Sequence, residues 1–229
     1  MGGGGFSMDD PVLDRFVLAL VDASRPKVCF LPTATSAVPV YAVAFFQAFP
    51  ATSFDSSFLD LFVRDGRDLR AFLLEQDVVY VGGGNTANLL AIWRAHGVDA
   101  ILREAWEAGV VLTGMSAGAS CWFEGSTTDS YGPLAALADG LGLVPGSFSP
   151  HFDSEPERRP LFHRLIAEGT LPAGLACDDF AAVHLIGTEL FEVVASRTQA
   201  GAYRIVRGED GQASEEPLSV KHLMGAGEG

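Results

Sequence analysis

A serine lies at the centre of the stretch Gly114-Met115-Ser116-Ala117-Gly118, directly after the apolar run 110–112. The spacing G-x-S-x-G after a strand is typical of a nucleophile elbow, a sharp strand-to-helix turn that small flanking residues permit. In such a turn the serine hydroxyl projects from the sheet, and the N–H of Ala117 faces the same space, where it can stabilise an oxyanion. The alternative is a small-residue turn that only packs beneath a helix. Taken alone, the motif favours that alternative.

A second backbone loop with little side-chain obstruction follows another apolar run, 78–81, as Gly82-Gly83-Gly84. Its N–H groups can face a developing negative charge, and we expect Gly84 to be the second oxyanion donor. A phosphate cradle is the alternative, but the loop lacks both the G-x-G-x-x-G pattern and a Walker lysine. The loop therefore favours acyl chemistry over nucleotide binding.

A catalytic serine needs a base to take its proton, and the chain has five histidines. His96 and His163 fall on expected helices, and His184 lies inside an apolar strand. His222 belongs to a Gly-rich tail that we expect to be mobile. His151, in "FSPHFDSE", follows a proline in a loop, and loops carry a disproportionate share of catalytic residues. We therefore predict His151 as the base.

The orienting acid is predicted in "GLACDDFAAV", where Asp178 and Asp179 follow an apolar strand. Carboxylates at the end of a buried strand are costly unless they are exposed, paired or functional. Capping of a turn is their structural alternative. An α/β-hydrolase places its acid before its histidine, so the order here disfavours that fold unless His184 or His222 is the base.

The elements that must position these residues alternate between short apolar runs and segments of helical period, the pattern of a parallel sheet covered by helices. Three expected helices end at a glycine: Gly97, Gly109 and Gly169. If the strands before the two glycine loops are neighbours, both loops meet at one edge of the sheet. The expected strands are 27–31, 78–81, 110–113, 175–177, 182–186 and 190–195, with 203–206 in a late edge hairpin.

Composition limits the class of protein further. With 229 residues, 48% of them hydrophobic, and no linker or repeat, we expect a single domain over residues 1–229. A net charge of −14 argues against nucleic acid and anionic membranes as partners. Three scattered cysteines indicate neither zinc nor a disulfide framework, and no apolar run is long enough to span a membrane. The opening lacks a signal-peptide layout, so we expect a cytoplasmic protein.

Four motifs in this order, "VGGGNT", "GMSAGAS", "SPHFD" and "CDDFAA", resemble the dipeptidase E family, α-aspartyl dipeptidases related to cyanophycinase. The resemblance covers about residues 2–206. It implies a three-layer parallel-sheet sandwich of the class I glutamine-amidotransferase-like, flavodoxin-like type, with serine in place of the amidotransferase cysteine. "GGGGFS" resembles the loop after the family's first strand, which we expect to be missing or shortened here; a cloning remnant is the alternative.

By motif, the resemblance implies a triad of Ser116, His151 and Asp179, with Gly84 and Ala117 as oxyanion donors. Family members often have glutamate at the acid position, so the shorter Asp179 is a departure and Asp178 stays open as an alternative. The family pattern places Asn85 beside the substrate.

Cleavage after an amino-terminal aspartate, in Asp-X dipeptides, is the activity that the resemblance implies. Arg158 is expected to bind the aspartyl carboxylate, with its neighbour Arg159 and a helix surface role as alternatives. Asp129 also resembles a family position near the site. We expect a small peptide as the partner, a monomer or homodimer, and neither metal nor cofactor. A cyanophycinase-like peptidase acting on β-aspartyl substrates and a non-catalytic binder are the competing hypotheses.

Overall fold

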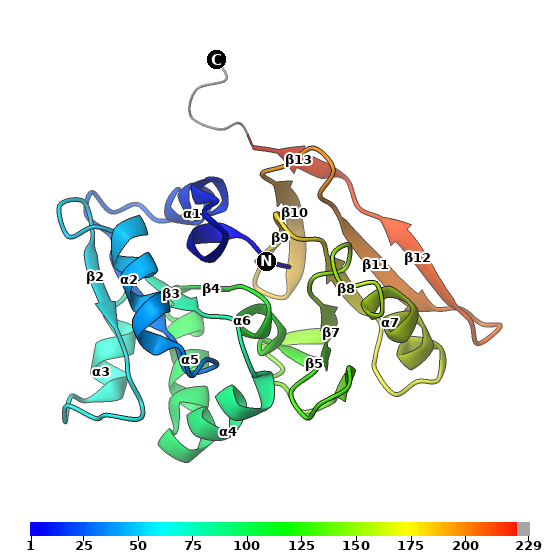
Figure 1. Cartoon of the computed structure of the whole chain (residues 1–229), viewed down its shortest axis with the longest axis horizontal. Coiled ribbons are helices and arrows are strands. Elements are labelled where there is room, and N and C mark those ends of the chain that lie inside the picture. The colour runs from blue at the N-terminus through cyan, green and yellow to red at the C-terminus, as the bar shows by residue number, and fades with distance from the viewer. Residues whose placement is uncertain (224–229) are drawn as a thin grey trace.

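The computed structural model describes residues 1–223 and contains a four-stranded parallel sheet that holds both glycine loops (Figure 1). The strand order is β2-β1-β3-β4. These strands are β1 (Lys27–Leu31), β2 (Asp55–Phe58), β3 (Val78–Val81) and β4 (Val111–Gly114). The expected strands 27–31 and 78–81 are confirmed residue for residue. Because β3 and β4 pair in parallel, the loops that follow them meet at one edge, as expected.

Helices cover both faces of this sheet, because alternate residues of its central strands enter two separate cores. In β1, Val28 and Phe30 face a core with α1 and α2, whereas Cys29 and Leu31 face a core with α3, α4 and α5. These helices are α1 (Pro11–Leu18), α2 (Val38–Ala48), α3 (Leu69–Leu74), α4 (Thr86–His96) and α5 (Val98–Glu107). The result is the three-layer arrangement expected from the sequence.

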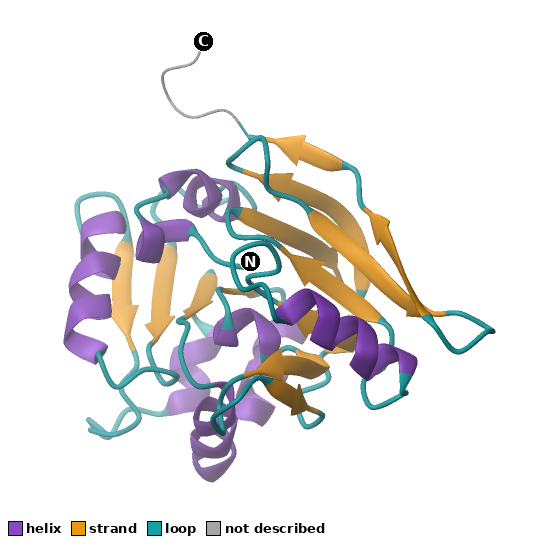
Figure 2. Cartoon of the chain, turned by 45° about the vertical axis from the view of Figure 1, so that its right-hand side comes forward, coloured by secondary structure: helices purple, strands orange, loops and turns teal. Residues whose placement is uncertain are grey.

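The second half of the chain forms two further sheets, visible in orange in Figure 2. One has the order β12-β11-β8-β7-β5-β6 and the other β13-β10-β9. Their strands are β5 (Phe123–Thr128), β6 (Ala135–Leu137), β7 (Val144–Ser149), β8 (Gly174–Cys177), β9 (Ala181–Ile186), β10 (Glu189–Ala195), β11 (Ala202–Arg207), β12 (Ala213–Pro217) and β13 (Val220–His222). Helix α7 (Arg158–Ala167) packs on β11 and β12.

One expectation about the end of the chain is confirmed and one is wrong. The late edge hairpin that contains 203–206 forms from β11 and β12, with β12 as the edge strand and β11 between β12 and β8. His222 is not in a mobile tail, because β13 pairs with β10 and places His222 beside Ala195. In both cases a strand too polar to detect, β12 or β13, supplies the additional pairing.

Glycines end the helices as expected. Gly97, Gly109 and Gly169 have φ values of 69°, 94° and 76°, the left-handed conformation of a helix C-cap. In the described residues, none of the helices has the length and apolar character needed to cross a lipid bilayer.

The first residues of the chain run through the middle of the molecule, between the parallel sheet and the later strands (Figure 1). Met1 hydrogen-bonds to the last residue of β4 and to the turn after it, and Gly2 and Gly3 hydrogen-bond to the segment that opens β9. The chain then enters the short helix η1 (Gly5–Met8). This segment therefore links the two halves of the fold.

Candidate active site

Ser116 occupies a strained turn between β4 and the short helix α6 (Ala117–Ser120). Its φ of 53° and ψ of −117° lie in a region that non-glycine residues rarely adopt, and such strain is concentrated at functional sites. A Cβ atom at Gly114 would run into the backbone of Gly118, and one at Gly118 would run into Val81 O. The two glycines thus let backbone pass close to backbone, and the same turn carries the serine in its strained conformation.

The glycine loop after β3 lies beside this serine. A Cβ atom on Gly83 would sit 3.4 Å from Ser116 Cβ, and Gly84, with a φ of 138°, leaves no room for a side chain against the backbone of Ala34. Within residues 1–223, neither the Gly84 N–H nor the Ala117 N–H has a hydrogen-bond acceptor. Two unsatisfied backbone donors beside a serine hydroxyl can stabilise an oxyanion.

His151 and Asp179 come together at the carboxyl ends of two neighbouring parallel strands. His151 follows β7 and Asp179 follows β8, and these strands pair directly. The His151 Nδ1 and Asp179 Oδ1 atoms form a hydrogen bond of 2.7 Å. His151 itself has a φ of 52°, so like Ser116 it is a non-glycine residue with a positive φ. The sequence paired these two residues only through the family resemblance, and the structure shows their side chains in contact.

Electrostatics favour an ionised Asp179. Burial acts to raise the pKa of its carboxyl, but hydrogen bonds from His151 and Ser154 and the charges of His151 and Arg158 outweigh it, so the pKa lies below its ordinary value. The Asp179 N–H in turn donates to Asp153 Oδ1 at 2.8 Å. An ionised carboxylate can only accept, so His151 Nδ1 carries the proton of this bond and Nε2 is left as the basic nitrogen.

Asp178 points the other way and has different partners. Its Oδ2 accepts hydrogen bonds from Gly201 N–H at 2.9 Å and from the Tyr203 hydroxyl at 3.2 Å, and its Oδ1 is buried without a partner. Burial raises the pKa of this carboxyl, and the Asp153 charge adds to the effect. Of the two adjacent acids, the structure places Asp179 against His151.

The serine and the His151–Asp179 pair are connected through the first three residues. Ser116 N–H donates to Met1 O at 3.2 Å, while a Cβ atom on Gly3 would collide with Asp179 Oδ1 and lie 3.1 Å from His151 Cε1. Two residues of extended chain span at most about 7 Å, so the serine and the pair lie on the same side of the fold. Among residues 1–223 no hydrogen bond joins Ser116 to His151, and such catalytic bonds are often long without substrate.

Sequence comparison assigns the chain to a known peptidase family. The sequence pattern of peptidase family S51 matches residues 1–193. The chain belongs to peptidase family S51.

Relatives agree with this S51 assignment. The chain is 49% identical over 225 residues to the uncharacterized peptidase YgaJ of Bacillus subtilis, with 97% of each chain covered. It is 30% identical to a peptidase E of Shewanella denitrificans over 94 residues, 40% of each chain, and 35% identical to a peptidase E of Streptomyces coelicolor over 97 residues. The protein is therefore a peptidase.

Solved structures agree with the flavodoxin-like fold expected from the sequence. A peptidase from an acI-B1 actinobacterium superposes with a TM-score of 0.72 at 18% identity, covering 96% of this chain and 92% of that chain. A protein of Listeria monocytogenes EGD-e described as a peptidase E superposes with a TM-score of 0.53 at 21% identity, covering 90% and 93%. The fold of this S51 peptidase is thus flavodoxin-like.

Two residues expected near the substrate, Asn85 and Asp129, differ in their contacts within the protein. Asn85 caps helix α4 by accepting from Asn88 N–H at 2.9 Å, and its amide donates to Ser130 O at 2.9 Å. Asp129 is exposed in a turn, and no hydrogen bond to its side chain is formed within residues 1–223. Asn85 directly follows the glycine loop, and its contact with substrate stays a prediction.

Arg158 is 4% exposed, so its side chain is buried and does not lie on the helix surface. Its Nε donates to Glu155 at 2.7 Å, and its Nη1 donates to Thr127 O at 3.0 Å. Arg159 instead lies over the ring of Phe152 and pairs with Glu215 at 2.6 Å. The charge of Arg158 is one of the causes that lower the pKa of Asp179, so this guanidinium lies near the Asp179 carboxylate.

Three of the other four histidines have structural partners away from Ser116. His163 hydrogen-bonds to Glu215 at 2.7 Å, His184 hydrogen-bonds to Glu192 at 3.3 Å, and His222 is a residue of β13 that lies beside Ala195 of β10. Sequence reasoning missed the partners that hold the site: Asp153 beneath Asp179 and the Met1–Gly3 backbone. The Asp153 signal was available, since it lies two residues after His151 in the same motif.

Proposed function

We propose that this S51 peptidase is a serine-type dipeptidase that hydrolyses dipeptides with an amino-terminal aspartate through an acyl-enzyme on Ser116. The observation that carries the proposal is the combination of a strained Ser116 elbow with a hydrogen-bonded His151–Asp179 pair on the same side of the fold. Family S51 membership and the peptidase E relatives support it.

In the proposed mechanism His151 Nε2 removes the Ser116 proton as the hydroxyl oxygen attacks the peptide carbonyl. Asp179 holds the imidazole in the tautomer with Nδ1 protonated and stabilises the imidazolium without taking its proton. His151 then protonates the leaving amine. His151 then takes a proton from water, which attacks the resulting ester, and returns the proton to Ser116 as aspartate is released.

The N–H groups of Gly84 and Ala117 act as the oxyanion hole of this mechanism. Both lack partners in the described residues, and both belong to loops packed closely against other backbone, because added Cβ atoms at Gly84 or Gly118 would meet backbone atoms. Each such donor contributes about 3 kcal/mol of transition-state stabilisation. Preorganised donors need no rearrangement during the reaction.

Selectivity for aspartate is assigned to Arg158, with Asn85 at the glycine loop as a second contact. Arg158 Nη2 makes no hydrogen bond to residues 1–223, while Nε and Nη1 are fixed by Glu155 and Thr127. A fixed guanidinium with one free nitrogen is suited to a short carboxylate side chain at a defined distance. A glutamate substrate would place its carboxylate one methylene too far.

The proposal is tested by replacing Ser116 and measuring hydrolysis of a panel of Asp-X, Glu-X, Asn-X and β-Asp-X dipeptides. Ser116→Ala should abolish turnover with an unchanged thermal melt, and the wild type should prefer Asp-X. Arg158→Lys should raise KM for Asp-X while Arg159→Lys, the matched control on the same helix, should not. Asp-X hydrolysis retained by Ser116→Ala would refute the nucleophile assignment.

The same panel separates the competing hypotheses. A cyanophycinase-like peptidase would favour β-Asp-X, because the β-linkage presents the α-carboxylate in place of the side-chain carboxylate. A non-catalytic binder would cleave nothing and leave Ser116 unlabelled by a serine-directed phosphonate. We also propose a cytoplasmic location, supported by three free, buried cysteines.

A further inference from the structure

Gly84, the proposed oxyanion donor, lies in a run of three glycines, so the peptide group that carries its N–H has little preference for one direction. Gly84 has a φ of 138°, which a residue with a side chain rarely adopts. Rotation of the peptide that joins Gly83 and Gly84 would turn the N–H away from Ser116 and bring a carbonyl oxygen to its place. A preorganised donor therefore needs contacts on both sides of this peptide.

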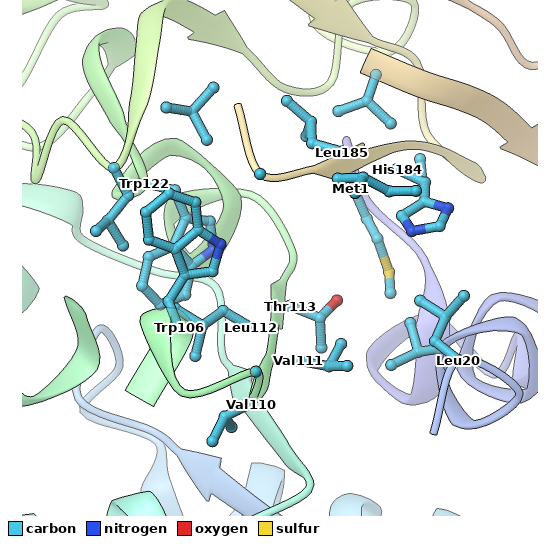
Figure 3. Close-up of a pocket in the computed structure, with 18 of the residues that line it drawn as sticks. Met1, Leu20, Trp106, Val110, Val111, Leu112, Thr113, Trp122, His184 and Leu185 are labelled. Atoms are coloured by element: carbon cyan, nitrogen blue, oxygen red, sulfur yellow. The ribbon is translucent and has the colours of Figure 1, made fainter. Parts of the chain in front are cut away.

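Strand pairing holds only the start of the glycine loop. Strand β3 ends at Val81, and the Gly82 N–H still donates to Leu31 O of β1 at 3.1 Å. Within residues 1–223, β4 has no strand beyond it, and residues 110–113 line an apolar cavity of about 530 Å³ on that side (Figure 3). The end of the glycine loop must therefore be anchored by other elements.

Asn85 anchors the end of the glycine loop with three hydrogen bonds. Its N–H donates to Ala34 O at 2.8 Å, and its side chain accepts from Asn88 N–H at 2.9 Å. Its Nδ2 donates to Ser130 O at 2.9 Å, in the loop between β5 and β6, 45 residues further along the chain. This third bond uses one of the two Nδ2 hydrogens, so the predicted contact of Asn85 with substrate is compatible with it.

The Ser130 hydroxyl joins the β5–β6 loop to the start of α4. Its Oγ accepts from Ala87 N–H at 3.2 Å, one of the first-turn groups that have no partner within a helix, and lies 2.7 Å from Thr128 Oγ1. Thr128 Oγ1 also accepts from Ser130 N–H at 3.2 Å and lies 3.5 Å from Thr86 Oγ1. Thr128 and Thr86 are buried, so the loss of one member leaves polar groups without a replacement from water.

We propose that Ser130 is a positioning residue for the oxyanion hole, a role that rests on the proposed function. Together with Thr128 it fixes Asn85 and the first turn of α4, and these fix the direction of the Gly84 N–H. Ser130 itself does not touch the reacting atoms. Because the oxyanion forms only during the reaction, loss of the Ser130 hydroxyl lowers kcat and leaves KM unchanged.

The experiment compares Ser130→Ala with Ser130→Thr, which keeps the hydroxyl, and with Ser56→Ala as the matched control. Ser56 also donates a hydroxyl hydrogen bond to a backbone oxygen, but it lies on the edge strand β2. Values of kcat and KM are measured for an Asp-X dipeptide, with a thermal melt of each protein. Removal of a whole oxyanion donor costs 10²–10³ in kcat, so a loosened donor should cost about tenfold. KM of Ser130→Ala, and both constants of the other two variants, should stay within about twofold of the wild type.

A tetrahedral adduct provides a second readout that a purely structural role would not change. In the α-aldehyde of aspartate, Ser116 Oγ bonds to the carbonyl carbon, and the C=O electron pair moves onto the oxygen that the Gly84 N–H faces. The Ser116 proton passes to His151. Ser130→Ala should weaken the binding of this aldehyde about tenfold and leave the binding of free aspartate unchanged.

Backbone ¹⁵N relaxation of Gly84 without substrate is a readout that needs no turnover. Its order parameter should fall from about 0.85 in the wild type to below about 0.6 in Ser130→Ala. Thr128→Val should have the same effects, and the double variant should have no larger ones, because the two hydroxyls act as one unit.

A rigid Gly84 in a folded Ser130→Ala protein, or a kcat within twofold of the wild type, would overturn the proposal. A rise in KM alone would assign Ser130 to substrate binding and would overturn it as well. If the wild type cleaves no dipeptide, the proposed reaction fails, and the relaxation of Gly84 still decides whether Ser130 holds the loop.

Discussion

Replacement of Gly3 by alanine tests how closely the first residues control the His151–Asp179 pair that we propose to be catalytic. A Cβ atom on Gly3 would lie well inside van der Waals contact with Asp179 Oδ1 and 3.1 Å from His151 Cε1, whereas ordinary contacts begin at 3.4 Å. Because the carboxylate must retreat by about 1 Å, the imidazole loses its orientation although all three proposed catalytic side chains are intact. A misplacement of about 1 Å lowers the rate by about 10²-fold, or about 2.7 kcal/mol of transition-state stabilisation.

The assay is kcat/KM for an Asp-X dipeptide, accompanied by a thermal melt and by ¹⁵N NMR of the His151 imidazole. Gly201→Ala is the matched control, because a Cβ atom there makes only ordinary contacts of 3.6 Å or more. We expect a loss of about 10²-fold for Gly3→Ala, a changed Nδ1 resonance and less than a twofold effect of Gly201→Ala. A folded Gly3→Ala protein with kcat/KM within threefold of the wild type would refute the reasoning.

Three further outcomes follow from contacts described above. Asp179→Asn should lower kcat by about 10⁴-fold, because the amide favours the wrong imidazole tautomer, whereas Asp178→Asn should change it less than about tenfold in the same dipeptide assay. Gly118→Ala should destabilise the fold by about 1–3 kcal/mol in urea unfolding, because the added methyl meets Val81 O. Burial raises the pKa of Asp14 to about 7, so the folded state keeps a proton that the unfolded chain releases near pH 4. The wild type should therefore lose up to about 4 kcal/mol of unfolding free energy between pH 4 and 8, and Asp14→Asn should not; parallel urea curves for the two proteins over that range would contradict this.

The sequence predicted best where one physical signal dominates. The apolar runs 27–31 and 78–81 are strands buried on both faces, and the glycines that end helices have the positive φ that such ends require. Polar strands were missed: β7 carries buried Ser147 and Ser149, and Ser149 is satisfied by a 2.8 Å hydrogen bond to Thr127 that no local pattern reveals.

The choice between adjacent residues was beyond sequence reasoning for a geometric reason. Successive side chains of an extended segment face opposite sides, so Asp178 and Asp179 have equal local signals and different partners. Arg158 and Arg159 at the start of helix α7 also have equal local signals, yet Arg158 is buried against Thr127 and Arg159 lies over the ring of Phe152. Only the tertiary arrangement distinguishes them.

The three thiols of the chain have a practical consequence for chemistry at the elbow. Cys29, Cys121 and Cys177 are fully buried, and burial raises the pKa of Cys29 and Cys177 to about 12. Because the thiolate is the reactive form, none of them should react with iodoacetamide in the native protein at neutral pH. A Ser116→Cys protein would then offer an alkylating reagent a single accessible sulfur, and the pH dependence of its carboxamidomethylation would report how strongly the neighbouring imidazole activates a nucleophile at that position.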